Sequence, residues 1–140
     1  MGRINMGRVI IGGLLAGLVI NISEFVLNMF VVAADMEAAM KAMNLPPLGP
    51  SQVGCFVVLS FFLGIAAVWL YAAIRPRFGP GVATATYAAL AIWFLSYAYP
   101  TAFLYVIKVF PRNVMVISVI WGLPEIVIAT IAGAWVYTET

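Results

Sequence analysis

The sequence contains no histidine, a single cysteine and no run of basic residues. Without histidine, the chain has no imidazole ligand for haem, zinc or copper and no imidazole for acid–base catalysis. Cys55 cannot form a disulfide within the chain, and its apolar surroundings favour a structural role. The scattered positive charge gives no sign of nucleic-acid binding. We therefore predict no metal site and no nucleic-acid partner.

Common catalytic motifs are missing as well. The sequence has no Gly-x-Ser-x-Gly elbow, no phosphate-binding loop and no activated-cysteine pattern. Together with the lack of histidine, this predicts that the protein is not an enzyme and needs no cofactor. A membrane enzyme built on Glu24, Asn28 and Glu125 is the remaining catalytic alternative.

Charged residues are scarce throughout the chain. They make up 9% of its 140 residues, and 65% of the residues are hydrophobic, whereas a soluble domain carries about 25% charged residues. A helix that crosses a bilayer needs about 20 residues, so this length has room for four such helices. We predict an all-α polytopic membrane protein, a four-transmembrane-helix bundle in one domain. We expect it to lie in the lipid bilayer of a cell membrane, specifically a bacterial inner membrane.

Four apolar stretches predict the membrane spans. They cover about residues 9–34, 52–74, 82–109 and 114–137. The helical pattern continues through residues 35–43, where methionines fall on one face, and this predicts a short amphipathic extension after the first helix. Pro100 and Pro124 lie inside the third and fourth spans. Because proline lacks an N–H, we expect a kink at Pro100 and a free carbonyl near Trp121.

The basic residues at the span ends bear on the orientation. Four of them fall on one predicted side and three on the other: Arg3, Arg8, Arg75 and Arg77, against Lys41, Lys108 and Arg112. The positive-inside rule therefore favours a cytoplasmic location for both termini. The difference of one charge leaves dual topology open.

A polar stripe runs along the first predicted helix. Its members are spaced by four, four, three and four residues and share one helical face: Gly13, Gly17, Asn21, Glu24 and Asn28. The two glycines allow another helix to approach closely. The amides and the carboxyl would be left unsatisfied against lipid, so we expect the stripe to face the bundle interior, an oligomer interface or a wet cavity.

The fourth predicted helix has a comparable face. Gly122, Glu125 and Ala129 follow helical spacing, and Pro124 adjoins the carboxyl. Counting residues from the span ends at about 1.5 Å per residue places Glu24 and Glu125 within one or two turns of the same depth. We therefore predict an intramembrane polar site of Asn21, Glu24, Asn28 and Glu125, with Gly13, Gly17, Gly122 and Ala129 packing the helices.

Two parts of the chain carry a resemblance to a known family. The first helix leads into an amphipathic stretch at residues 36–45, and the small-residue fourth helix ends at residues 131–135. In these parts the chain resembles a family of small bacterial four-helix integral membrane proteins of unknown function. The resemblance implies the four-helix fold and no particular activity.

The plan of the chain is also similar to that of the small multidrug-resistance transporters, which have four short helices and a glutamate in the first. Glu24 is the matching residue. This resemblance implies dimeric assembly and coupled transport. The chain departs from the family pattern at its long methionine-rich first connection and at Pro124 and Glu125.

These observations leave two functions open. The first is an accessory or self-associating subunit of a larger membrane complex, in which the polar seam joins helices. The second is a proton- or cation-coupled small transporter or channel that uses Glu24 and Glu125. Transport predicts carboxyls that line a cavity wetted from one side. The structural role predicts a dry and fully paired seam.

Overall fold

Helices make up most of the chain in the computed structural model, which describes residues 2–139. No strand occurs in that range. The helices are α1 (Met6–Val26), α2 (Ala33–Ala42), α3 (Pro50–Phe78), α4 (Val82–Trp93), α5 (Tyr99–Val106) and α6 (Arg112–Val136). A π-helical turn, Leu27–Val31, extends α1, and a second one, Phe94–Ala98, joins α4 to α5 without a break. The protein is therefore all-helical, as predicted.

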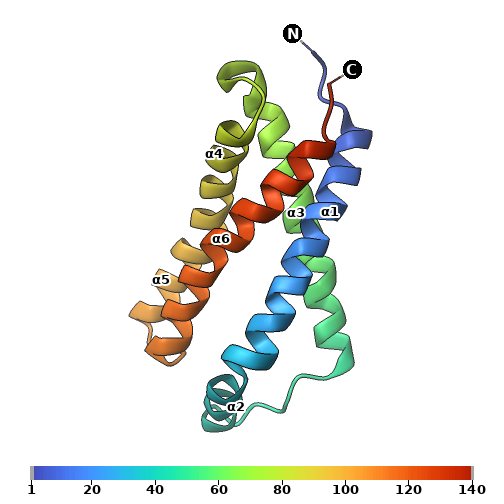
Figure 1. Cartoon of the computed structure of the whole chain (residues 1–140). Helices are drawn as coiled ribbons and strands as arrows, with labels where there is room; N and C mark the ends of the chain where they lie inside the picture. Colours follow the sequence, from blue (N-terminus) through green and yellow to red (C-terminus); the bar gives the residue numbers. More distant parts are fainter. Residues whose placement is uncertain (1, 140) are drawn as a thin grey trace.

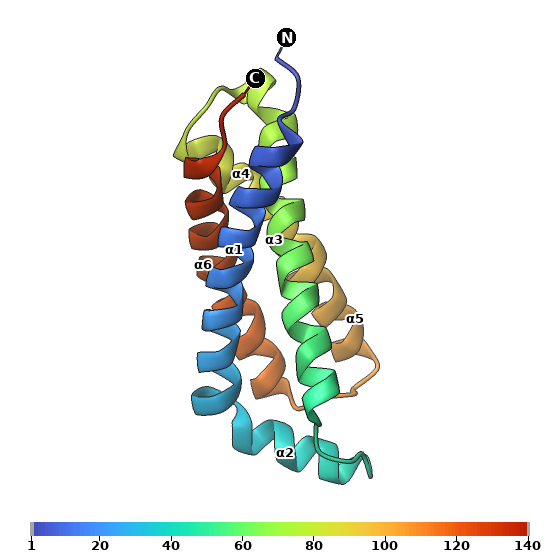
Figure 2. The ribbon, with the colours of Figure 1, turned by 90° about the vertical axis from the view of Figure 1, so that its right-hand side faces the viewer.

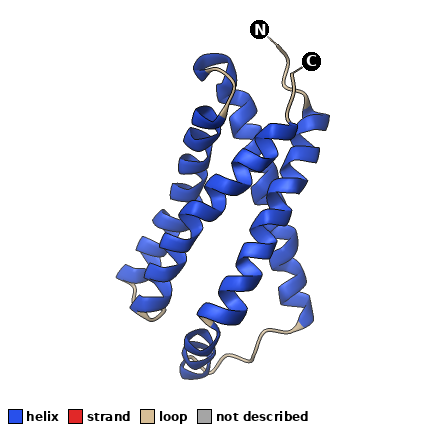
Figure 3. Cartoon of the chain, viewed as in Figure 1, coloured by secondary structure: helices blue, strands red, loops and turns tan. Residues whose placement is uncertain are grey.

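Four helical segments are long and apolar enough to cross a membrane. They cover Met6–Val31, Pro50–Phe78, Val82–Val106 and Arg112–Val136. Figure 1 shows them running side by side, with both ends of the chain near the same end of the bundle. Short connections join them, except for the longer segment between α2 and α3 (Figure 3).

The predicted amphipathic extension of the first helix forms a separate helix, α2. Figures 1 and 2 together show α2 lying across the end of the bundle instead of continuing the axis of α1. The change of direction follows the π-helical turn and occurs at Val32, whose backbone (φ −111°, ψ 2°) is not helical. Glu37 and Lys41 form an exposed ion pair of 2.7 Å on α2. The hydrogen bond from Lys41 and its positive charge lower the pKa of the Glu37 carboxyl.

Glycines allow the helices to pack almost backbone to backbone. A Cβ atom on Gly64 of α3 would lie 2.4 Å from the backbone oxygen of Gly13 in α1. A Cβ atom on Gly12 would lie 2.5 Å from the backbone oxygen of Gly133 in α6. Both distances are far shorter than a van der Waals contact. α1 therefore lies at the centre of the packing, between α3 and α6.

Polar contacts join the ends of the bundle. Near the termini, the Arg75 guanidinium lies 3.3 Å from the Glu139 carboxylate and 5.6 Å from the centre of the Tyr137 ring. At the opposite end, Asn113 Nδ2 donates a 2.8 Å hydrogen bond to Asp35 Oδ2. The first contact joins α3 to the C-terminal segment, and the second joins α2 to α6.

The bundle is packed less closely toward the end that carries α2. α5 contributes no buried residue, and the buried residues of α3 begin only at Gly64. In Figure 1, α5 and the adjoining half of α6 diverge from α1 and α3 toward the end that carries α2. The polar side chains described next lie between these two groups of helices.

The glycine contacts predict a sharp difference between two substitutions in α3. Gly64→Ala adds a methyl group against the backbone of α1, and overpacking of this kind costs about 1–3 kcal/mol. Gly54→Ala adds the same group where no atom lies within 4 Å. We expect Gly64→Ala alone to lower the free energy of unfolding, measured by SDS titration in mixed micelles. Equal stability of the two variants would contradict the close α1–α3 packing.

Candidate functional site

The hydroxyl of Tyr97 connects the two glutamates that the sequence placed at similar depth. Tyr97 Oη lies 2.9 Å from Glu24 Oε1 and also forms a hydrogen bond with Glu125 Oε1. Glu24 belongs to α1, Tyr97 to the π-helical turn between α4 and α5, and Glu125 to α6. One phenol group thus joins three of the four long helical segments.

Three further side chains complete the arrangement. Ser23 Oγ donates a 2.5 Å hydrogen bond to Glu125 Oε2, and Trp121 Nε1 donates a 2.9 Å bond to Ser23 Oγ. Asn28 Nδ2 donates to Glu24 Oε2 at 3.1 Å. Each of the four carboxyl oxygens therefore has a partner within the chain. We call the whole set the polar cluster: Ser23, Glu24, Asn28, Tyr97, Trp121 and Glu125.

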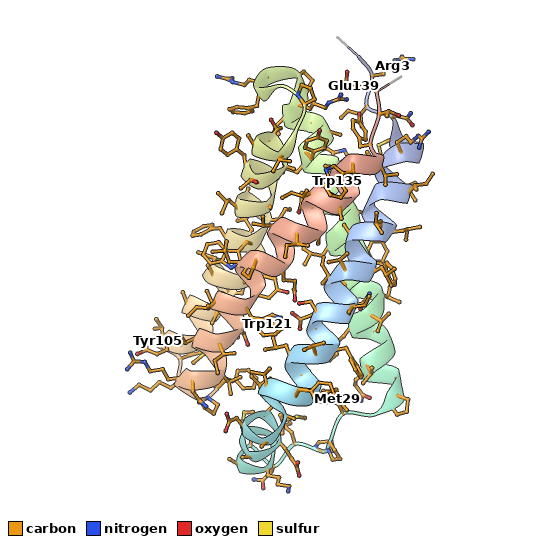
Figure 4. The ribbon with its side chains drawn as sticks, in the orientation of Figure 1. Arg3, Met29, Tyr105, Trp121, Trp135 and Glu139 are labelled. Atoms are coloured by element: carbon orange, nitrogen blue, oxygen red, sulfur yellow. The ribbon has the colours of Figure 1, made fainter. Side chains whose placement is uncertain are left out.

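Burial changes steadily across the polar cluster. Glu125 is 4% exposed, Glu24 and Tyr97 are half-buried, and Asn28 is exposed. In Figure 4, the labelled Trp121 side chain lies between α6 and α1, and its Nε1 bonds to Ser23 of α1. The hydrogen bonds therefore form a continuous chain from an exposed amide to a buried carboxyl.

The bonds at Tyr97 impose a proton count. A phenol has one hydrogen and can donate it to one carboxyl at a time. The second short oxygen–oxygen contact is a hydrogen bond only if the other carboxyl carries a proton and donates it to Tyr97 Oη. With both bonds formed, at least one of the carboxyls of Glu24 and Glu125 carries a proton. At most one negative charge then remains instead of two, which lowers the cost of burying the pair.

The local backbone explains how Tyr97 reaches this position. Pro100 cannot donate an N–H to the carbonyl four residues earlier, and the π-helical turn Phe94–Ala98 ends two residues before it. The wider turn presents Tyr97 to α1 and α6. Asn28 lies in the other π-helical turn, Leu27–Val31. Such turns often occur at functional sites, and both in this chain adjoin the polar cluster.

Pro124 does not interrupt the helix that contains it. α6 runs without interruption from Arg112 to Val136, although Pro124 lies inside it. On the face toward α4, Trp93 Nε1 donates a 2.9 Å hydrogen bond to the Val119 carbonyl. The Pro124 ring is exposed, and Glu125 beside it points inward. We therefore find no break in the helix at the carboxyl.

The structure brings together three of the four predicted site residues. Glu24, Asn28 and Glu125 belong to the polar cluster, whereas Asn21 does not. Asn21 Nδ2 instead donates a 3.3 Å hydrogen bond to the Val57 carbonyl of α3. Asn21 therefore continues the contact that Gly17 makes with α3 four residues earlier.

The predicted packing residues lie at helix contacts. Gly13 and Gly17 face α3, Ala129 is 1% exposed in the core, and a Cβ atom on Gly122 would lie 2.6 Å from Tyr97 Cδ1. Gly122 thus makes room for the phenol ring that binds Glu125, one turn further along α6.

Sequence reasoning missed three members of the polar cluster. Tyr97, Ser23 and Trp121 are not among the residues that the helical spacing predicts for the site. Pro100, three residues after Tyr97, was the available signal for irregular backbone there. Nothing in the spacing shows that a serine beside Glu24 bonds to the other glutamate.

The donor set does not suggest a metal centre. Within residues 2–139, no group of three or more histidine, cysteine, aspartate or glutamate side chains is placed to hold a metal ion.

Comparison with family models, with curated proteins and with solved structures gives no match. The function must therefore be inferred from the geometry of the chain itself.

The polar cluster predicts that the hydroxyl of Tyr97 stabilises the fold. Tyr97→Phe keeps the ring against Gly122 but removes the bridge between two carboxyls. Leaving such buried groups unpaired costs about 1–3 kcal/mol. Tyr99→Phe is the matched control, because Tyr99 is 64% exposed. SDS titration in mixed micelles should show a loss of stability for Tyr97→Phe only. A neutral Tyr97→Phe would show that the bridge contributes nothing to folding.

Proposed function

We propose that the chain is an integral membrane protein that acts as an accessory, self-associating subunit of a membrane complex, and that the polar cluster fixes its helices in one register. The observation that carries this proposal is the complete pairing of both carboxyls inside the chain. Glu24 and Glu125 use all four oxygens on Ser23, Asn28 and Tyr97. A seam paired in this way stabilises an arrangement of helices without requiring a ligand.

The outer surface supports insertion into lipid. Large apolar side chains are widely exposed along the helices, among them Phe30 at 76%, Val106 at 76% and Trp135 at 78%. In water such a surface would drive aggregation. In a bilayer such a surface faces the lipid chains. The four apolar helices are long enough to span the bilayer.

The energetics of polar groups in membranes support a positioning role. Hydrogen bonds between transmembrane helices contribute about 0.6 kcal/mol each on average. This is too little to account for the stability of the bundle, but a displaced helix would leave Glu125 buried and unpaired. The cluster therefore selects one arrangement among several with similar apolar packing.

Incomplete coverage of two helices supports association. α5 has no buried residue, and the part of α3 before Gly64 has none either. These segments lie on the diverging parts of the bundle (Figure 2). A second copy or another subunit that packs there would bury helical surface that this chain leaves uncovered.

Proton-coupled transport is the second candidate. Two observations favour it: the proton that the bonding pattern requires between Glu24 and Glu125, and the chain of hydrogen bonds that reaches exposed Asn28. Proton relays in pumps and transporters use carboxyls at membrane depth in this way. In that mechanism, Glu24 would exchange its proton through the exposed end of the cluster.

Proteoliposomes with a pH-sensitive dye inside distinguish the two functions. The accessory role predicts that wild type and Glu24→Gln leave an imposed pH gradient equally intact. It also predicts that wild type and Glu24→Gln form the same oligomer. The number of photobleaching steps of singly labelled chains measures the size of that oligomer. Glu37→Gln is the control, because this carboxyl is exposed on α2.

Two results would overturn the accessory role. One is dissipation of the gradient by wild type and Glu37→Gln but not by Glu24→Gln, which would establish proton transport. The other is a single photobleaching step for every particle, which would exclude self-association.

A further inference from the structure

A second feature lies away from the polar cluster, where α5 ends and α6 begins. A pocket of about 350 Å³ opens there, lined by Tyr105, Val106, Lys108, Phe110, Arg112 and Met115. Figure 4 shows Tyr105 near this end of α5, far from the chain termini. Because Val106 ends one candidate span and Arg112 begins the next, the pocket lies at the expected level of lipid headgroups.

The two cations in this pocket differ from those paired elsewhere. Lys41 is paired with Glu37 at 2.7 Å, and Arg75 is paired with Glu139 at 3.3 Å. Neither Lys108 nor Arg112 forms an ion pair with any carboxylate of residues 2–139. The pocket therefore carries two positive charges without a counter-ion from the described part of the chain.

One acidic residue of α2, Asp35, contacts α6 beside Arg112 and already has a partner there. Asp35 accepts a hydrogen bond from Asn113, the residue after Arg112. Asp35 is not among the residues that line the pocket. It joins α2 to α6 without neutralising Lys108 or Arg112 through an ion pair.

The backbone around the pocket also favours an anion. α6 begins after Pro111 without a side-chain cap, so the free N–H groups of its first turn add partial positive charge at this level. The Tyr105 hydroxyl is a further hydrogen-bond donor in the lining.

We propose that this pocket binds the phosphate headgroup of an anionic membrane lipid. Lys108 and Arg112 contact the phosphate, and the Tyr105 hydroxyl donates to one of its oxygens. Val106, Phe110 and Met115 supply an apolar wall for the glycerol and the first acyl carbons. Basic pockets between transmembrane helices are suited to lipid headgroups of this class. The proposal rests on the membrane location proposed above and not on the accessory role.

The test is native mass spectrometry of the purified chain titrated with phosphatidylglycerol or phosphatidylcholine. We expect wild type to bind phosphatidylglycerol at least about tenfold more tightly. Replacing both Lys108→Gln and Arg112→Gln removes two phosphate contacts, which should weaken binding by about thirtyfold. Lys41→Gln combined with Arg77→Gln lowers the net charge equally and should bind like wild type.

Additional measurements test the proposal even if the variant with both Lys108→Gln and Arg112→Gln folds poorly. Lys108→Arg with Arg112→Lys retains both charges and should still prefer phosphatidylglycerol. Inorganic phosphate at millimolar concentration should not displace the lipid from wild type. Equal binding of the two lipids by wild type, or equal loss in the Lys41 and Arg77 control, would refute the proposal. Displacement by inorganic phosphate would assign the pocket to free phosphate instead.

Discussion

The structure depends on one constraint, the need of a buried carboxyl for hydrogen-bond partners. Glu125 is 4% exposed and cannot obtain them from water. Its partners come from other segments, Ser23 of α1 and Tyr97 of the π-helical turn before α5. Because each partner is fixed to its own helix, pairing Glu125 sets the position of α1 and of the α4–α5 segment relative to α6.

Small residues make this pairing sterically possible. Gly12 and Gly133 let α1 and α6 approach until a single added carbon would clash with backbone, and Gly122 leaves space for the ring of Tyr97. A larger residue at 122 would displace the phenol from the carboxyl one turn away. The glycines therefore contribute to the polar cluster as well as to apolar packing, and the two kinds of contact specify the same arrangement of helices.

Much of this arrangement could be predicted from the sequence. Apolar runs between prolines and charges gave the number and class of the long helices, and four-residue spacing correctly placed Glu24 beside Asn28. The role of Tyr97 could not be predicted, because a π-helical turn inserts an extra residue and changes which side chains share a face. Asn21 follows the regular spacing, yet it bonds to α3, since an arc of one helix can contact two neighbours.

The two candidate sites lie at different depths on the same helix. Arg112 begins α6 and Glu125 follows thirteen residues later, which corresponds to about 20 Å along the axis. In a hydrocarbon core of about 30 Å, a headgroup at Arg112 leaves Glu125 beyond the midplane. Because α6 is continuous between them, it sets their separation rigidly. A lipid at the pocket would therefore fix the height of α6 in the membrane, and hence the depth at which Glu125 and its partner Glu24 lie.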